Sequence, residues 1–133
     1  MNRNIDQATL LLRVSLGSVF IAHGLLKLLV FTLPGTAQFF VSVGFPGWLA
    51  YLVIAAEIGG GALLILGLWT RPIALALTPI MLGATWVHLG NGWLFTNANG
   101  GWEFPLFLAL ATVVLALLGS GAYTIGKPNL VTR

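Results

Sequence analysis

The sequence predicts an all-α integral membrane protein, a four-helix bundle formed by a single transmembrane domain. Of its 133 residues, 58% are hydrophobic and only 7% are charged, whereas a soluble domain is about 25% charged. The chain also holds four apolar stretches that approach the roughly 20 residues needed to cross a bilayer. Glycine, proline and tryptophan gather between these stretches, where turns and membrane interfaces are expected.

The first predicted span covers residues 7–31, and Asp6 can serve as its N-cap or as an acid in its first turn. Arg3 ahead of an apolar run superficially resembles the start of a signal peptide. However, Arg13 and Lys27 interrupt this run, which is also too long for a signal sequence and is not followed by a cleavage motif. We therefore interpret it as a retained span.

Residues 32–47 carry no charge and combine glycine and proline with phenylalanine. This segment is too short to span a bilayer, so we expect a folded loop or a short re-entrant helix at the interface. The second predicted span covers residues 48–69, begins and ends with tryptophan as an aromatic belt would, and has Glu57 near its middle.

The third predicted span covers residues 72–89 and carries His88 near its far end. Residues 90–102 form a second uncharged loop, rich in glycine, asparagine and tryptophan. The fourth predicted span covers residues 103–118 and is followed at once by glycine, which commonly ends a helix.

The basic residues predict how these spans are oriented. Four spans place both termini and the turn between spans two and three on one side of the membrane. These segments carry Arg3, Arg71, Lys127 and Arg133, whereas the two remaining loops carry no lysine or arginine. The positive-inside rule therefore predicts that both termini are cytoplasmic.

Composition also excludes several functional classes. The formal charge of +3 and pI near 10 come from scattered basic residues without a basic run or an aromatic platform, so we expect no nucleic-acid binding. The chain has no cysteine, which excludes disulfides, thiolate metal sites and iron–sulfur clusters within it. A redox role would require a diffusible or borrowed electron carrier.

The first span carries a polar stripe. Arg13, Gly17, Phe20, Gly24 and Lys27 recur at helical spacing and share one face, with His23 close to Lys27. An arginine or lysine near the centre of a span costs roughly 2.5 to 3.5 kcal/mol on insertion scales. The stripe is therefore predicted to be a buried seam, for which the other spans supply partners.

Glu57 is the central anionic candidate. It can be the counter-charge of Lys27 or a hydrogen-bond partner of His23, and it can also exchange protons with a bound ligand. Counting helical rise from the outer end of each span places these three residues, His88 and Glu103 in the outer half of the bundle. Arg13 falls near the cytoplasmic third, where it can snorkel or bind the carbonyl end of a neighbouring helix.

Three ligands are compatible with the two histidines. Haem ligation by His23 and His88 is disfavoured because their depths differ by about two helical turns, and a metal site is disfavoured because Glu-x-x-His spacing is absent. The third is a quinone whose carbonyl is protonated by neutral imidazoles beside Glu57. The aromatic wall of this quinone site would be formed by four side chains that are also suited to an aromatic belt at the membrane interface: Phe20, Trp86, Trp93 and Trp102.

An ordered set of motifs resembles the DoxX family of small four-span bacterial membrane proteins over about residues 8–126. The set is Arg13-x-x-x-Gly17-x-x-Phe20-x-x-His23-Gly24-x-x-Lys27, Glu57-x-x-Gly60-Gly61-x-Leu63-x-x-x-Gly67-x-x-x-Arg71, Met81 with Ala84, Gly100-Gly101-x-Glu103 and Gly119-x-Gly121-x-Tyr123-Thr124-Ile125. Gly126 departs from it, because many relatives carry an acid there.

The resemblance implies a multi-pass protein of the bacterial cytoplasmic (inner) membrane, in a family often labelled as oxidoreductases. Some relatives are subunits of thiosulfate:quinone oxidoreductase or of a terminal quinol oxidase assembly. Others are linked to oxidative-stress complexes with extracytoplasmic partners. No redox centre is encoded in this chain.

We therefore expect a membrane subunit of a quinone-linked redox system, with an outward-facing polar pocket lined by His23, Lys27, Glu57, His88 and Glu103. In it Lys27 stabilises negative charge on the reduced quinone, Glu57 and His23 exchange protons, and the structural residues are Arg13, Gly24, Gly60 and Arg71. Two alternatives stay open: a non-enzymatic scaffold for an extracytoplasmic enzyme, and a small-solute or proton transporter, which a weak internal repeat favours. Partners beyond the lipid bilayer are a membrane or extracytoplasmic redox protein and further copies of the chain.

Overall fold

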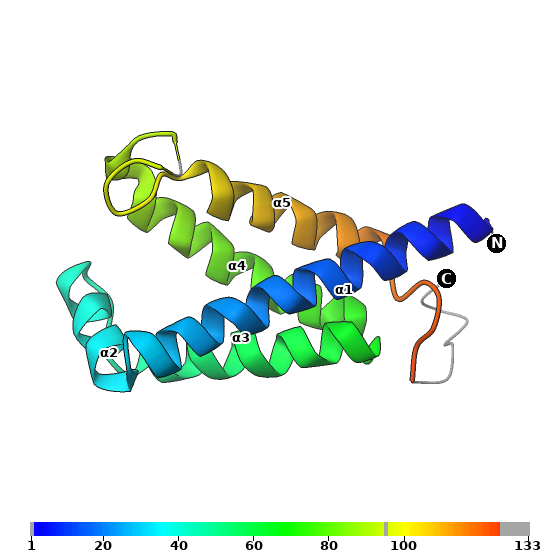
Figure 1. The fold of residues 1–133 in the computed structure, drawn as a ribbon, viewed down its shortest axis with the longest axis horizontal. Helices are drawn as coiled ribbons and strands as arrows, with labels where there is room; N and C mark the ends of the chain where they lie inside the picture. Colours follow the sequence, from blue (N-terminus) through cyan, green and yellow to red (C-terminus); the bar gives the residue numbers. More distant parts are fainter. Residues whose placement is uncertain (1, 95, 126–133) are drawn as a thin grey trace.

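The computed structural model describes residues 2–94 and 96–125, and these are helical without any strand. Figure 1 shows the order of the elements. They are α1 (Arg3–Leu25) with its π-helical continuation η1 (Leu26–Val30), α2 (Leu33–Ser42), α3 (Leu49–Leu66), α4 (Thr70–His88) with the 3₁₀ turn η2 (Leu89–Asn91), and α5 (Glu103–Leu118). The predicted all-α class is therefore confirmed.

Three segments are long and apolar enough to cross a membrane, namely Arg3–Val30, Leu49–Leu66 and Thr70–Asn91. The fourth predicted span is the apolar helix α5, which has 16 residues and is about 24 Å long. A hydrocarbon core is about 30 Å thick, so α5 is shorter than a full span. The chain is a helical membrane bundle, and crossing of the bilayer by α5 stays a prediction.

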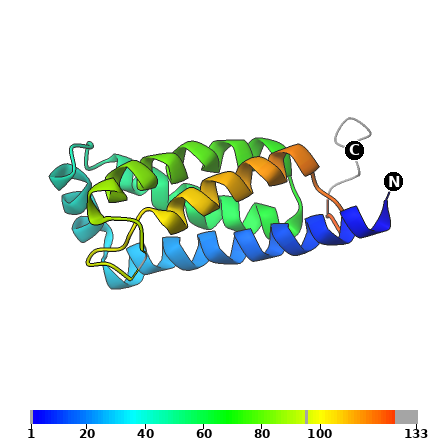
Figure 2. The same ribbon diagram turned by 90° about the horizontal axis from the view of Figure 1, so that it is seen from above.

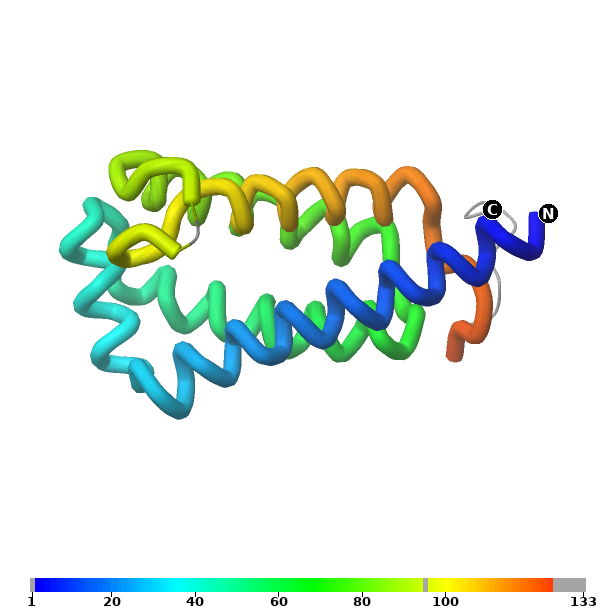
Figure 3. Tube along the Cα trace, turned by 45° about the horizontal axis from the view of Figure 1, so that its top comes forward, coloured from blue at the N-terminus to red at the C-terminus, as the bar shows by residue number. Residues whose placement is uncertain are grey.

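The long helices form two packed pairs, as Figures 2 and 3 show. α1 lies along α3, α4 lies along α5, and contacts between α3 and α4 join the pairs. The short helix α2 lies at the end of the bundle away from the N-terminus (Figure 1). This helix forms within residues 32–47, where a folded loop or a short helix was expected.

Local sequence explains where α1 begins and shows which of the two roles expected for Asp6 it has. The side-chain oxygen of Asn2 accepts hydrogen bonds from the backbone N–H groups of Asn4 and Ile5, at 2.8 and 3.4 Å. Asn2 is therefore the N-cap and the helix starts at Arg3, earlier than predicted. Asp6 lies in the first turn, where its charge complements the positive end of the helix dipole.

The core lies between the two pairs and is apolar. Its buried members come from α1, α3, α4 and α5, and the largest of them are Leu16, Phe20, Leu64, Leu77, Met81, Leu108 and Leu115. Helix α1 comes close to α3 at two facing glycines, Gly17 and Gly61. A Cβ atom on either one would lie 2.6 Å from the carbonyl oxygen of the other. Only glycine permits this approach, a common device for packing helices in membranes.

We predict that Gly61→Ala destabilises the bundle by roughly 1–3 kcal/mol, because the added methyl group would overlap the backbone of α1. The matched control is Gly59→Ala in the same helix, where a Cβ atom would have no neighbour within 4 Å. This control should be neutral or stabilising by about 0.5–1 kcal/mol, since alanine favours a helix over glycine. Unfolding by SDS, followed by circular dichroism, measures both. Equal effects of the two substitutions would contradict the glycine contact.

Candidate functional site

An ion pair joins the first two long helices near the end where α2 lies. Lys27, in η1, donates a hydrogen bond from Nζ to Oε1 of Glu57 in α3. The lysine side chain is 24% exposed and the glutamate is completely buried. Of the two partners expected for Glu57, the structure therefore shows Lys27.

Gly24 lets α3 approach α1 beside this pair. A Cβ atom on Gly24 would lie 2.6 Å from Cγ1 of Ile58 and 3.3 Å from Cβ of Glu57. A larger residue would push α3 away and lengthen the Lys27–Glu57 contact. Gly24 is therefore required for this close approach. A Cβ atom on Gly60 would lie 3.4 Å from side-chain atoms of Ile73 and Leu77 in α4, an ordinary van der Waals contact, so the packing of α3 on α4 does not by itself require glycine there.

The second carboxylate oxygen of Glu57, Oε2, has different surroundings from the first. Oε2 is buried and makes no hydrogen bond to any residue that the structure describes. An unsatisfied acceptor in a buried site costs about 1–3 kcal/mol, and more when the group is charged. Such an atom favours binding of a proton, a water molecule or a ligand that donates a hydrogen bond.

Sequence reasoning missed the backbone conformation at Lys27. Residues Leu26–Val30 form a π-helical turn, in which the N–H of Phe31 donates to the carbonyl oxygen of Leu26 at 3.1 Å. Such turns are rare and are often found at functional sites. Composition and periodicity carry no signal for a π-helical turn, so only the three-dimensional structure could reveal this one.

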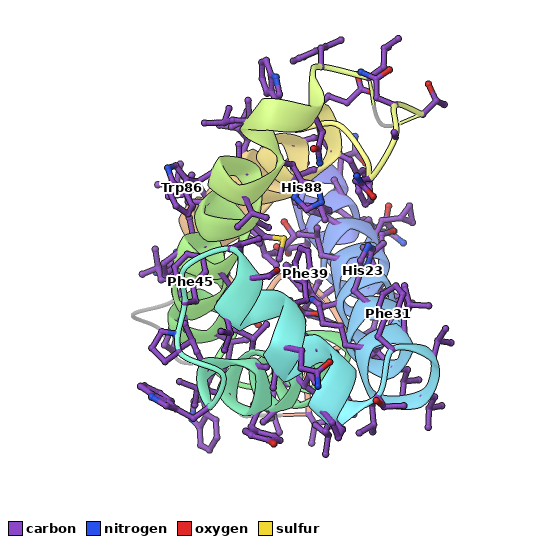
Figure 4. The ribbon with its side chains drawn as sticks, turned by 90° about the vertical axis from the view of Figure 1, so that its left-hand side faces the viewer. His23, Phe31, Phe39, Phe45, Trp86 and His88 are labelled. Carbon is purple, nitrogen blue, oxygen red and sulfur yellow. The ribbon has the colours of Figure 1, made fainter. Side chains whose placement is uncertain are left out.

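The two histidines are arranged alike but on different helices. Nδ1 of His23 lies 2.8 Å from the carbonyl oxygen of Val19, and Nδ1 of His88 lies 2.7 Å from that of Ala84. Because a carbonyl only accepts, Nδ1 carries the proton in each ring and Nε2 is left for another partner. Both histidines lie at the end of the bundle near α2 (Figure 4).

The remaining residues expected to line a pocket have separate surroundings. The ring of His23 lies 5.8 Å from that of Phe104 in α5, and Gly100 lies against the ring of His88. Glu103 is half-buried at the start of α5. The ion pair of Lys27 and Glu57 thus joins two members of the expected set of five.

The expected aromatic wall is divided among three places. Phe20 is 1% exposed and belongs to the core. Trp86 is 59% exposed and packs edge-on against Phe45, with ring centroids 5.6 Å apart (Figure 4). Trp93 and Trp102 pack against each other, at 4.4 Å. Phe20 therefore contributes to packing between helices, and Trp86 lies on the surface.

Other features of the described residues limit the chemistry. No three of their histidine, aspartate and glutamate side chains lie close enough together to hold a metal ion. A groove of about 90 Å³ between α3 and α4 has an apolar lining of Ala56, Gly60, Ile73, Ala76 and Leu77. It offers no polar side chain that could orient a quinone.

Arg13 lies at the opposite end of the bundle and is completely buried. Its guanidinium donates to the carbonyl oxygen of Ser120 through Nη1 and to that of Tyr123 through Nη2, the latter at 2.8 Å. Two arrangements were expected for Arg13, and the structure shows the one in which it binds carbonyl groups near the end of a neighbouring helix, here in the segment after α5. Arg71, also expected to be structural, is half-buried in the first turn of α4.

Comparison with known proteins gives consistent matches. A family model described as DoxX matches residues 8–90, which include Lys27 and Glu57. The Bacillus subtilis (strain 168) protein named "Putative oxidoreductase CatD" is 38% identical over 120 residues, 90% of this chain and 85% of that protein. The Escherichia coli (strain K12) "Inner membrane protein YqjF" is 30% identical over 129 residues, 96% of this chain and 95% of that protein. "Inner membrane protein YphA" of the same strain is 28% identical over 126 residues, 89% of this chain and 87% of that protein. No solved structure matches the chain.

A double-mutant cycle tests the ion pair. We predict that Lys27→Met costs roughly 3–5 kcal/mol of stability, because the fully buried Glu57 loses its counter-charge. Glu57→Gln should cost less, since the freed lysine is partly exposed and can extend to the interface. The double variant should be more stable than the sum of the single effects predicts, by about 1–3 kcal/mol.

SDS unfolding measures these stabilities. The matched control combines Lys27→Met with Asp6→Asn, which removes a carboxylate at the other end of the bundle. The losses in free energy of unfolding caused by these two substitutions should add within about 0.5 kcal/mol. Additive effects for Lys27 and Glu57 as well would show that their contact contributes no coupling energy.

Proposed function

Because the chain belongs to the DoxX family of membrane proteins, we propose that it is the membrane subunit of a quinone-linked redox system. In this proposal the Lys27–Glu57 pair is the site at which a quinone gains or loses protons. The electrons come from or pass to a separate redox protein, since the chain has no cysteine and therefore no thiolate-bound redox centre of its own. The name of the Bacillus relative, which contains the word oxidoreductase, supports a role of this class.

The unpartnered Oε2 atom of Glu57 is the observation that carries the proposal. It is a buried acceptor beside a cation, and a quinol hydroxyl group is a donor of matching chemistry. The opposite oxygen is already bound to Lys27. Glu57 can therefore accept a hydrogen bond from a ligand without giving up its counter-charge.

Reduction of a quinone to a quinol takes two electrons and two protons. Lys27 stabilises negative charge that develops on the quinone oxygen as electrons arrive, because an ammonium group in an apolar site interacts strongly with an anion. Glu57, a carboxylate in the resting ion pair, first takes up a proton from the aqueous phase and then delivers it to one quinone oxygen, and His23 takes up and delivers the second proton through Nε2, the nitrogen that is not bound to Val19. Oxidation of the quinol runs through the same groups in reverse.

The first test is binding of decylubiquinone and of its reduced form to the protein in lipid nanodiscs, measured by quenching of tryptophan fluorescence. We predict that Glu57→Gln weakens binding of the reduced form, decylubiquinol, by about tenfold or more, the range expected when a charged hydrogen-bond partner is lost. The matched control Asp6→Asn removes a carboxylate from the opposite end of α1 and should leave the affinity unchanged.

Equal affinity of wild type and Glu57→Gln, with both proteins folded, would contradict the proposal. A stable protein partner that co-purifies with both forms while neither binds the quinone would favour the scaffold. Uptake of a solute into proteoliposomes without a partner would favour the transporter.

We also propose that the chain resides in the bacterial inner membrane with both termini in the cytoplasm. The inner-membrane names of two relatives support the location, and the placement of basic residues supports the orientation. The described end of the chain also lies beside the start of α1, since the N–H of Ala122 donates to the carbonyl oxygen of Asp6 at 3.2 Å.

The absence of native cysteine makes this orientation easy to test with single introduced cysteines. We predict that Ala98→Cys, in the loop before α5, reacts with a membrane-impermeant maleimide in intact spheroplasts. Asn4→Cys should react only after the membrane is permeabilised. The reverse pattern would contradict the orientation, and reaction of both in intact spheroplasts would contradict placement of these residues on opposite sides.

A further inference from the structure

We propose that Thr36, in the short helix α2, is a positioning residue that holds Lys27 on Glu57 through the backbone of η1. This inference rests on the role proposed for the ion pair but is independent of the ligand that the pair binds.

The hydroxyl group of Thr36 connects α2 to the turn that carries the lysine. Oγ1 lies 3.1 Å from the carbonyl oxygen of Lys27 and 2.8 Å from that of Thr32, and Thr36 is only 4% exposed. A hydroxyl group has one proton, which these two carbonyl groups share. The bond reaches the backbone of the same residue whose side chain forms the ion pair, so it restrains the position from which the lysine extends.

The π-helical geometry of η1 makes such a restraint necessary. A π-helical turn closes with one more residue than an α-helical turn and is intrinsically uncommon. A shift of this turn by one residue along the chain would rotate the Lys27 side chain by about 100° around the helix. That rotation would point the ammonium away from α3 and leave Glu57 without its counter-charge.

The junction between η1 and α2 shows a second sign of constraint. Thr32 has a φ angle of +67°, a conformation that a β-branched residue adopts only under strain. Its carbonyl oxygen accepts from Thr36, and its own hydroxyl oxygen accepts from the N–H of Gly35 at 3.2 Å. The surrounding hydrogen bonds therefore hold this junction in one conformation.

Contacts that do not involve the Thr36 hydroxyl hold α2 in place. Phe40 packs against Phe45, with ring centroids 6.2 Å apart, and Phe45 packs against Trp86 of α4 at 5.6 Å. Figure 4 shows Phe45 and Trp86 side by side. Removing the hydroxyl should consequently free the turn at Lys27 while α2 stays docked.

The reactivity of the Lys27 amine measures whether it is held on Glu57. An amine attacks an acylating reagent only as the free base, so pairing with a carboxylate slows the reaction. The chain has only one other lysine, Lys127, whose peptide serves as an internal reference. Limited acetylation by the N-hydroxysuccinimide ester of acetic acid, followed by mass spectrometry, gives the ratio of the two rates in wild type and variants.

We expect Thr36→Val, which keeps the shape and removes the hydroxyl, to raise the relative acetylation rate of Lys27 by about three- to tenfold, the range that corresponds to one net hydrogen bond. Thr36→Ser keeps the hydroxyl and should retain the wild-type rate. The matched control is Thr9→Val, because Thr9 is 1% exposed and its hydroxyl donates to the carbonyl oxygen of Ile5 at 2.8 Å, remote from the pair. It should also retain the wild-type rate, whatever its stability.

An unchanged rate in Thr36→Val would overturn the inference. An increase shared by Thr9→Val would overturn it too, because it would reflect general loosening of the bundle. Decylubiquinol binding by the same variants separates this inference from the proposed function. If Glu57→Gln binds the quinol more weakly but the acetylation rate is unchanged in Thr36→Val, only the inference is overturned. If the acetylation rate rises in Thr36→Val but the wild-type protein binds no quinol, only the proposed function is overturned.

Discussion

The Lys27–Glu57 ion pair is the contact on which the rest of this arrangement depends. A completely buried carboxylate in a membrane bundle requires a counter-charge, and Lys27 supplies it from the neighbouring helix. The pair can form only where the two backbones come close, which the missing side chains at Gly17, Gly24 and Gly61 allow. Charge and glycine spacing therefore specify the same packing of α1 on α3.

A second buried charge, Arg13 in the middle of α1, serves a different purpose. Arg13 binds two carbonyl groups in the segment after α5, and Gly67 at the end of α3 lies close to its guanidinium. The carboxyl ends of both helices carry partial negative charge, which compensates the arginine. The N–H of Ile125 also donates to the carbonyl oxygen of Leu66, at 3.0 Å. This junction therefore connects α1 to the end of α3 and to the segment that follows α5.

The two charged junctions differ in whether their buried side chain can take up a proton, and this difference separates structure from function. Arg13 uses both terminal nitrogens of its guanidinium on backbone carbonyl groups and acts as a clamp. Its Nε is buried without a partner among the described residues, but a guanidinium only donates hydrogen bonds and stays protonated. Glu57 uses one oxygen and leaves the other without a partner among the residues described. A buried group with remaining capacity to bind a donor is suited to chemistry, and the proposed quinone site follows from that asymmetry. The contact from Thr36 to the lysine carbonyl then links this chemistry to α2 at the end of the bundle.

The amino-acid sequence by itself determined the class of the protein, the extent of α5 at residues 103–118, and the face of α1 that had to be buried. Hydrophobic periodicity and the cost of burying charge are local properties, so they can be read along the chain. The tertiary structure alone decided that Glu57 pairs with Lys27, that Arg13 binds the segment after α5, and that Thr36 bonds to the turn at Lys27. It also placed the start of α1 at Arg3, with Asn2 as the N-cap, and placed Phe20 in the core and Trp86 on the surface. These outcomes depend on the rotation and distance of helices relative to one another and on a π-helical turn. Periodicity shows which face is buried but does not show which atoms that face meets.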